Sequence, residues 1–319
     1  MSRAVPPACR AVLCLAVLSL SPAPRWERAL APGRGCWPPR CAPGQLPLAT
    51  PPVEHGGRLL MLGDGAASDR VYESGDGVRW TERRHEGGWG PRYGVAIASF
   101  RGALWRAGGF VEERAGGRDG ARRAFNDVWR SPDGVRWTRV LAAAPWPPRA
   151  RAQLVAFRDT LWLIGGEPAD SLVWHSADGV TWHPVAGVPA QAIDAQRALV
   201  HRGRLWLVGG GTWGAPAADV WSSPDGRAWT RATAAAPWPG RMGAGVAAFR
   251  GRLWLFGGAD HGDVWSSADG RDWAREPDLP GIPRAANYSV VFRDALWVFG
   301  GKTGGRGGTG FSDEVWALR

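Results

Sequence analysis

The stretch from residue 250 to residue 276, RGRLWLFGGADHGDVWSSADGRDWARE, contains the pattern on which most of the chain is built. An apolar run ends at Phe249, and Arg250-Gly251 turns it into a second run, LWLFGG. A third run begins at Asp263, and the segment Ser267–Gly270 turns it into a fourth around Trp273. Apolar runs of strand length separated by such turn residues predict four antiparallel strands.

Copies of this unit follow one another along the sequence. The glycine pair recurs at Gly108-Gly109, Gly165-Gly166, Gly209-Gly210, Gly257-Gly258 and Gly300-Gly301, after a degenerate Gly63-Asp64-Gly65. The turn before the fourth strand recurs as SPDG or SADG in four units and as GDG in the first. A period of roughly 45 to 55 residues is typical of propeller blades, each a sheet that must stack on its neighbours. Six units therefore predict an all-β, six-bladed propeller.

The 21 tryptophans recur in phase with these landmarks. They are expected in the second and third strands, around the fourth, and in the loops between units, with Leu60 and Tyr72 taking two of these places in the first unit. A large flat side chain at repeated blade contacts buries about 150–250 Å² each time, so this aromatic content is core. Trp213 alone has no equivalent in the other units.

Through its LWLFGG, DVW and final-strand tryptophan landmarks, the chain resembles the Kelch-repeat family, specifically the galactose-oxidase-like propellers. The resemblance implies one propeller domain over residues 24–319. It implies little about activity, because propellers host unrelated functions. The SPDG turns also resemble the Asp-box of sialidases, but are one residue short of it.

The last unit stops after its third strand, and the N-terminal region holds the missing piece. Residues 25–30, RWERAL, parallel residues 136–141, RWTRVL, which belong to the fourth strand of the second unit. We therefore expect residues 25–30 to complete the last blade. Such an interlock would hide an open sheet edge and couple the two ends of the ring.

Residues 1–23 read as a secretory signal peptide, with an apolar run from Ala11 to Leu20 that is too short to span a bilayer. The expected location is therefore outside the cytoplasm, either extracellular or periplasmic. Cys36 and Cys41 remain after cleavage, and an oxidising compartment favours a local disulfide between them.

The formal net charge of +10 suggests an anionic partner, although an arginine-rich composition bias would give the same charge. Nucleic acid is not expected as a partner, because the core consumes the aromatic side chains that would stack on bases. The sequence predicts a monomer with no membrane span, cofactor or metal.

Alternating strand direction places the loops between second and third strands, which vary in length, on the same face as the loops between blades. Propellers place ligands among such variable loops. An arginine near the start of each inner strand could clamp carboxylates, sulfates or phosphates there. The alternative is that each arginine holds its own loop to carbonyls or to a repeated acid. These candidates are Arg40, Arg92, Arg149, Arg197, Arg241 and Arg284.

Three residues that break the repeat complete the candidate site. Trp213 could stack on a sugar ring, and Asp260-His261 lies on a short loop of the same face. No catalytic residue can be assigned, because the separations of the loop carboxylates are unknown. We therefore expect a secreted, non-catalytic propeller that binds a protein or glycan partner. The alternative is a carbohydrate-active enzyme, similar to a glycosidase, a sialidase or an oxidase, that uses the same face.

Overall fold

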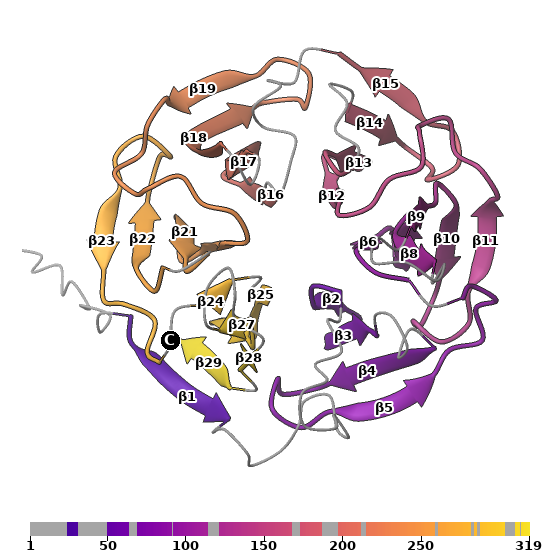
Figure 1. Ribbon diagram of the computed structural model, residues 1–319, viewed down its shortest axis with the longest axis horizontal. Helices are drawn as coiled ribbons and strands as arrows, with labels where there is room; N and C mark the ends of the chain where they lie inside the picture. Colours follow the sequence, from indigo (N-terminus) through magenta and orange to yellow (C-terminus); the bar gives the residue numbers. More distant parts are fainter. Residues whose placement is uncertain are drawn as a thin grey trace, which may run out of the picture.

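Six four-stranded antiparallel sheets form the blades of a ring in the computed structural model (Figure 1). The structure describes residues 24–30, 50–63, 69–90, 92–113, 121–167, 173–186, 197–211, 215–258, 261–281, 284–285, 288–303, 310–312 and 314–319. No helix long and apolar enough to cross a bilayer occurs in these ranges. The predicted fold class, blade number and strand order are confirmed.

The inner strands surround the central channel. They are β2 (Val53–His55), β6 (Ala96–Phe100), β12 (Gln153–Phe157), β16 (Arg197–His201), β20 (Gly245–Phe249) and β25 (Tyr288–Phe292). The second strands are β3 (Arg58–Leu62), β7 (Ala103–Ala107), β13 (Thr160–Ile164), β17 (Arg204–Gly211), β21 (Arg252–Phe256) and β26 (Ala295–Phe299). The blades are numbered 1 to 6 in this order.

The remaining two strands of each blade lie further out. The third strands are β4 (Arg70–Ser74), β10 (Val128–Ser131), β14 (Val173–Ser176), β18 (Pro216–Ser223), β22 (Val264–Ser267) and β29 (Val315–Leu318). The outer strands are β5 (Thr81–Arg84), β11 (Thr138–Leu141), β15 (His183–Val185), β19 (Thr230–Thr233), β23 (Ala274–Glu276) and, in blade 6, β1 (Trp26–Leu30).

Blade 6 is completed by the N-terminal strand, as the sequence predicts. Trp26 pairs with Leu318 and Arg28 with Trp316, while the backbones of Arg25 and Arg319 exchange hydrogen bonds of 3.1 and 3.2 Å. The Trp26 ring meets Phe256 of blade 5 edge to face, at 6.3 Å between centroids. Strand β1 therefore joins blade 6 by its backbone and contacts blade 5 by its side chain.

The turns between inner and second strands lie on one face of the ring, together with the turns before the outer strands. We call this the turn face. In the latter turns serine and aspartate side chains accept backbone N–H groups: in blade 2, Ser131 Oγ accepts from Gly134 at 2.8 Å and Asp133 Oδ1 from Val135 at 3.0 Å. Side chains thus satisfy the backbone groups that a turn leaves unpaired.

The glycine of each such turn also packs on the preceding blade. Gly179 in blade 3 has φ +76°, and a Cβ atom there would lie 2.2 Å from the ring of Trp105 in blade 2. The same relation links Gly226 to Trp162 and Gly270 to Trp206. The absence of a side chain is therefore what lets neighbouring blades approach each other.

Replacing Gly179 by alanine is expected to destabilise the fold by about 3 kcal/mol, because backbone strain and overpacking against Trp105 add together. The matched control is Gly102→Ala, where φ is +69° but nothing lies within 4 Å of the added Cβ. That variant should lose about 1 kcal/mol from strain alone. Urea unfolding of both variants measures the difference, and equal losses would show that the contact with Trp105 is unimportant.

Candidate functional site

Three loops on the face opposite the turn face, here called the loop face, contain strands that the sequence analysis took for irregular loops. The hairpin β8 (Phe110–Glu113) and β9 (Ala121–Ala124) extends blade 2, and β17 and β18 continue outward to the pair Gly211–Pro216. The strands β24 (Arg284–Ala285), β27 (Lys302–Thr303) and β28 (Gly310–Phe311) form a further sheet beside blade 6. The described parts of these three loops are therefore largely additional β-structure.

Arg92, Arg149 and Arg241 end the loops between blades and are buried, with 6%, 1% and 2% of their surface exposed. Arg92 forms a forked pair with Asp127, at 2.5 and 2.9 Å, and donates to the carbonyl of Gly108 at 3.3 Å. Arg149 donates to the carbonyls of Gly165 at 3.2 Å and Pro147 at 3.3 Å. Two roles were possible for these arginines, binding an anion or holding their own loop. These contacts are those of the second role.

Arg241 repeats this arrangement in blade 5. It donates to the carbonyl of Gly257 at 3.0 Å and forms a forked pair with Asp263, whose carboxylate also accepts the indole N–H of Trp265 at 2.6 Å. Burial alone would raise the pKa of Asp263, but the hydrogen bonds from Arg241 and Trp265 and the charge of Arg241 lower it to about 2. The pair is therefore ionised over the whole physiological range.

Arg197 does not belong to this set, although the sequence analysis grouped it there. Arg92, Arg149, Arg241 and Arg284 each stand eight residues before the Phe that ends their inner strand, whereas Arg197 stands four before the equivalent His201. Arg197 is the first residue of β16 and pairs with Val208. Its equivalents by register are Ala96, Gln153, Gly245 and Tyr288, each at the start of its own inner strand.

Blade 4 also departs from its neighbours at the repeated acid. Asp219, which corresponds to Asp127 and Asp263, is 4% exposed and accepts the indole N–H of Trp221 at 2.6 Å. No hydrogen bond reaches its Oδ1 atom within the described residues. Blade 4 thus keeps the acid but has its arginine at the start of the inner strand.

At the loop-face end of the channel, Gln153, Arg197 and Tyr288 form what we call the channel mouth. All three are partly exposed, whereas the equivalent positions in blades 2 and 5 are the small, buried Ala96 and Gly245. The Nε of Arg197 donates to the carbonyl of Ala244 in blade 5 at 3.1 Å. Burial lowers the pKa of Arg197, and the neighbouring Tyr288 opposes that shift.

The guanidinium of Arg197 has unused hydrogen-bonding capacity. Its Nη atoms have no acceptor, and no carboxylate pairs with it, among the residues that the structure describes. A guanidinium carries five N–H donors and stays protonated, so a partly desolvated one strongly favours an incoming anionic oxygen. Gln153 is not among the predicted site residues, although alignment of the inner strands on their last residue places it level with Arg197.

Between blades 2 and 3 the loop face carries Arg151, an arginine with an unusual backbone conformation. Arg151 has φ +59°, while the other non-glycine residues of positive φ in the described chain lie in the turns of the turn face. Its backbone N–H bonds to the carbonyl of Gly94 at 2.7 Å and its side chain to Glu167 at 2.8 Å. This arginine, unlike Arg197, is already neutralised.

The other candidates are placed as follows. His261 is partly exposed, and its backbone N–H donates to the carbonyl of Gly258 at 3.0 Å. Arg284 begins β24, which pairs with β27. Arg40, Trp213, Asp260, Cys36, Cys41 and residues 1–23 lie outside the described residues. Among the described residues, no group of three or more His, Cys, Asp or Glu side chains could hold a metal ion.

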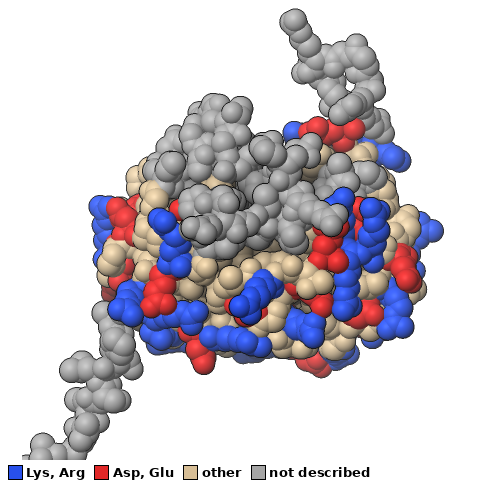
Figure 2. Space-filling view, turned by 90° about the horizontal axis from the view of Figure 1, so that it is seen from below, with Lys and Arg blue, Asp and Glu red and all other residues tan. Residues whose placement is uncertain are grey.

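The net positive charge does not gather into one patch on the side of the ring that Figure 2 shows. Basic and acidic side chains alternate there. In the described chain many basic side chains form ion pairs, such as Arg58–Glu73 and Arg84–Asp69, both at 2.5 Å. On the side that Figure 2 shows, recognition of an anion would therefore depend on individual sites.

Comparisons with known proteins show the fold. Residues 168–280 match the family described as the DUF6242 beta propeller domain, and no curated protein matches the chain. A solved structure titled "Structure of YjhT" is similar, with a TM-score of 0.69 and 17% identity over 85% of this chain and 95% of that one. At this identity the likeness concerns architecture alone. The chain is a six-bladed β-propeller.

Proposed function

We propose that this protein is a secreted, non-catalytic propeller that binds an anionic group of a glycan or protein partner at the channel mouth. The observation that carries the proposal is Arg197, a partly buried guanidinium with no acidic partner in the described structure. Arg92, Arg149 and Arg241 are neutralised or bound to carbonyls, so among the candidate arginines whose side chains the structure describes, Arg197 is the one that departs from the architectural pattern.

The surroundings of Arg197 suit recognition of a single anionic group. The carbonyl of Ala244 holds one edge of the guanidinium through Nε, which leaves the Nη atoms for the partner. Gln153 and Tyr288, which are also partly exposed, stand at the same register on their own inner strands. A forked arginine contact fits a carboxylate or a sulfate.

Binding is favoured over catalysis by the state of the nearby acids. Glu167 is paired with Arg151 at 2.8 Å, and Glu112 lies 3.8 Å from Arg122 across the β8–β9 hairpin. Both carboxylates therefore already have an arginine partner within the protein. Secretion through residues 1–23, a Cys36–Cys41 disulfide and membership of the Kelch type are parts of the same proposal.

Replacing Arg197 by glutamine is expected to weaken partner binding by tenfold or more, since loss of a charge-assisted contact costs about 1.5–3 kcal/mol. Arrays of acidic and neutral glycans, with a secreted-protein library in parallel, identify the partner, and calorimetry then compares variants. Arg122→Gln is the matched control, because it removes one positive charge from the same face.

The proposal would fail if Arg197→Gln bound the partner as tightly as the unaltered protein, or if neutral and acidic ligands bound equally. Melting curves of both variants should lie within a few degrees of the parent, because Arg197 makes one hydrogen bond within the described structure.

A further inference from the structure

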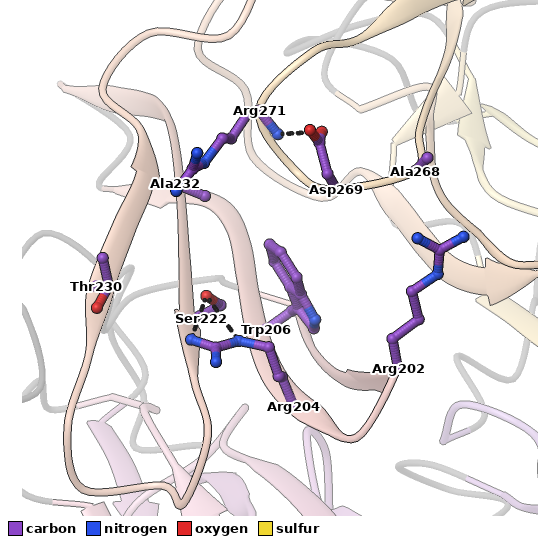
Figure 3. Close-up of a pocket in the computed structure, with 9 residues that line it drawn as sticks. All are labelled: Arg202, Arg204, Trp206, Ser222, Thr230, Ala232, Ala268, Asp269 and Arg271. Atoms are coloured by element: carbon purple, nitrogen blue, oxygen red, sulfur yellow. Dashed lines mark hydrogen bonds between the residues drawn. The ribbon is translucent and has the colours of Figure 1, made fainter.

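A pocket lies on the turn face, between blades 4 and 5 (Figure 3). Its volume is about 380 Å³. The floor includes the part of the Trp206 indole in β17 that stays accessible, 5% of that residue, and the turn of blade 5 forms one wall with Ala268 and Asp269. We call it the blade 4–5 pocket. It lies on the opposite face of the ring from the channel mouth.

Small side chains line this pocket at a position where blades 2 and 3 carry larger ones. By register, the residue beside each second-strand tryptophan is Arg130 in blade 2, His175 in blade 3 and Ser222 in blade 4. The Arg130 guanidinium lies 5.8 Å from the Trp105 ring, and the His175 ring 5.1 Å from Trp162. In blade 4 the outer strand supplies only Thr230, where blade 3 has His183.

The same position is occupied differently in blades 5 and 6. In blade 6 the Arg319 guanidinium lies 5.7 Å from the Trp297 ring. In blade 5 Ser266 bonds to Arg252 at 2.9 Å and to Glu276 at 2.5 Å, and Trp254 lines a smaller pocket of about 210 Å³. Blade 4 differs from blade 5 in that its serine, Ser222, bonds to an arginine but to no carboxylate within the described residues.

Three arginines surround the opening. Arg202 and Arg271 are exposed and Arg204 is partly exposed, and none of them forms an ion pair within the described residues. Arg204 donates through Nε and one Nη to Ser222 Oγ, at 3.3 and 3.1 Å, which fixes its guanidinium beside Trp206 and leaves other N–H groups unused (Figure 3).

Asp269 is the one acid that lines the pocket, and it is engaged by its own turn. Its Oδ1 accepts the backbone N–H groups of Arg271 and Asp272 at 2.9 and 3.1 Å, and Ser267 Oγ donates to it at 3.2 Å. Three guanidiniums against one carboxylate leave a net charge of about +2 on the lining. An aromatic floor with a cationic rim matches a ring that carries an anionic group.

We propose that the blade 4–5 pocket binds a small cyclic carboxylate, with its ring on Trp206 and its carboxylate held by Arg204 and Arg271. The pocket is at the small end of ligand sites, so one ring fills it. The inference does not depend on the channel mouth, which uses different residues on the other face.

Benzoate and glucuronate serve as probes, with benzyl alcohol and methyl glucoside as their uncharged counterparts. Saturation-transfer NMR and calorimetry are expected to show binding of at least one acid, and at least tenfold weaker binding of its neutral counterpart, equivalent to about 1.4 kcal/mol. Binding of benzoate would indicate that the pocket accepts a flat aromatic ring, and binding of glucuronate would indicate that it accepts a sugar ring. Equal binding of acid and neutral probe, or no binding of either acid at 10 mM, about ten-thousandfold above a micromolar Kd, would overturn the proposal.

Two variants locate the site. Ser222→His copies the cover of blade 3 and should abolish binding, and Arg271→Gln, a change at an exposed turn residue, should weaken it at least fivefold. Arg250→Gln, on the neighbouring turn outside the pocket, is the control and should bind as the parent does. Arg197→Gln should also leave probe binding unchanged. Unaltered binding in both Ser222→His and Arg271→Gln would place the probes elsewhere and refute the assignment.

Discussion

A chain that begins at residue 31 is expected to melt at least about 10 °C below one that begins at residue 24. The shorter chain loses the pairing of β1 with β29 and the contact of Trp26 with Phe256. Loss of a packed tryptophan costs about 3 kcal/mol or more, and unmade hydrogen bonds along one strand add about 1 kcal/mol each. For a chain of this size a loss of about 5 kcal/mol corresponds to a shift of that order.

The longer chain is the control, since both lack the proposed signal peptide. Removal of β1 also leaves β29 as an open edge, so the shorter chain should self-associate as its concentration rises. A synthetic peptide of residues 24–30 should raise its melting temperature again. Coincident melting curves for the two chains would mean that β1 contributes nothing to closure of the ring.

Replacing Arg241 by methionine is expected to destabilise the protein by about 3–5 kcal/mol, because the ionised Asp263 would be left inside the structure without its partner. The Arg241 side chain is fully buried and that of Asp263 is 15% exposed. Changing both residues, to Met and Asn, should cost less than the sum of the single changes. Arg79→Ala, at a side chain that is 92% exposed, is the control and should cost less than about 0.5 kcal/mol.

Acid provides an independent check on the same pair. The pKa of Asp263 is about 2 in the folded protein and 3.8 in its ordinary state. Its contribution to stability is therefore complete above about pH 4 and is lost as the pH falls towards 2. Between these limits the parent protein should lose about 2 kcal/mol more than Asp263→Asn. The free energy of unfolding of both proteins is measured with denaturant at each pH. If it falls equally in the parent protein and in Asp263→Asn, the ion pair with Arg241 does not stabilise the carboxylate of Asp263.

Repetition is the reason why the fold could be predicted from the sequence. A single SADG turn or LWLFGG run is ambiguous, but each recurs in phase with the tryptophans, and the six sheets and the closing strand follow from that phase. The loop-face strands were not predicted, because β8 and β9 are rich in charge and the segment that includes β27 and β28 is rich in glycine. Pairing between neighbours, such as Glu112 with Arg122, overrides that composition.

The candidate site was less predictable, because its residues are defined by register. In the sequence Arg197 resembles the repeated arginines of the other blades. Its pairing with Val208 shows that it stands at the start of the inner strand, at the channel mouth. The blade 4–5 pocket depends on which residues pair beside Trp206. These are Ser222 in the next strand and Thr230 in the strand after it, and neither residue type by itself predicts a binding site. Departures from a repeat can be recognised only after every residue has been assigned to its place in the repeat.

The pairing of β1 with β29 also governs the order of events during biosynthesis. Residues 26–30 leave the ribosome before the five other blades are made, whereas their partners at 315–318 emerge after them. Contacts so distant in sequence form slowly. Until residues 315–318 have emerged, Trp26 lacks its strand partner, so the growing chain presents apolar surface to which a chaperone can bind.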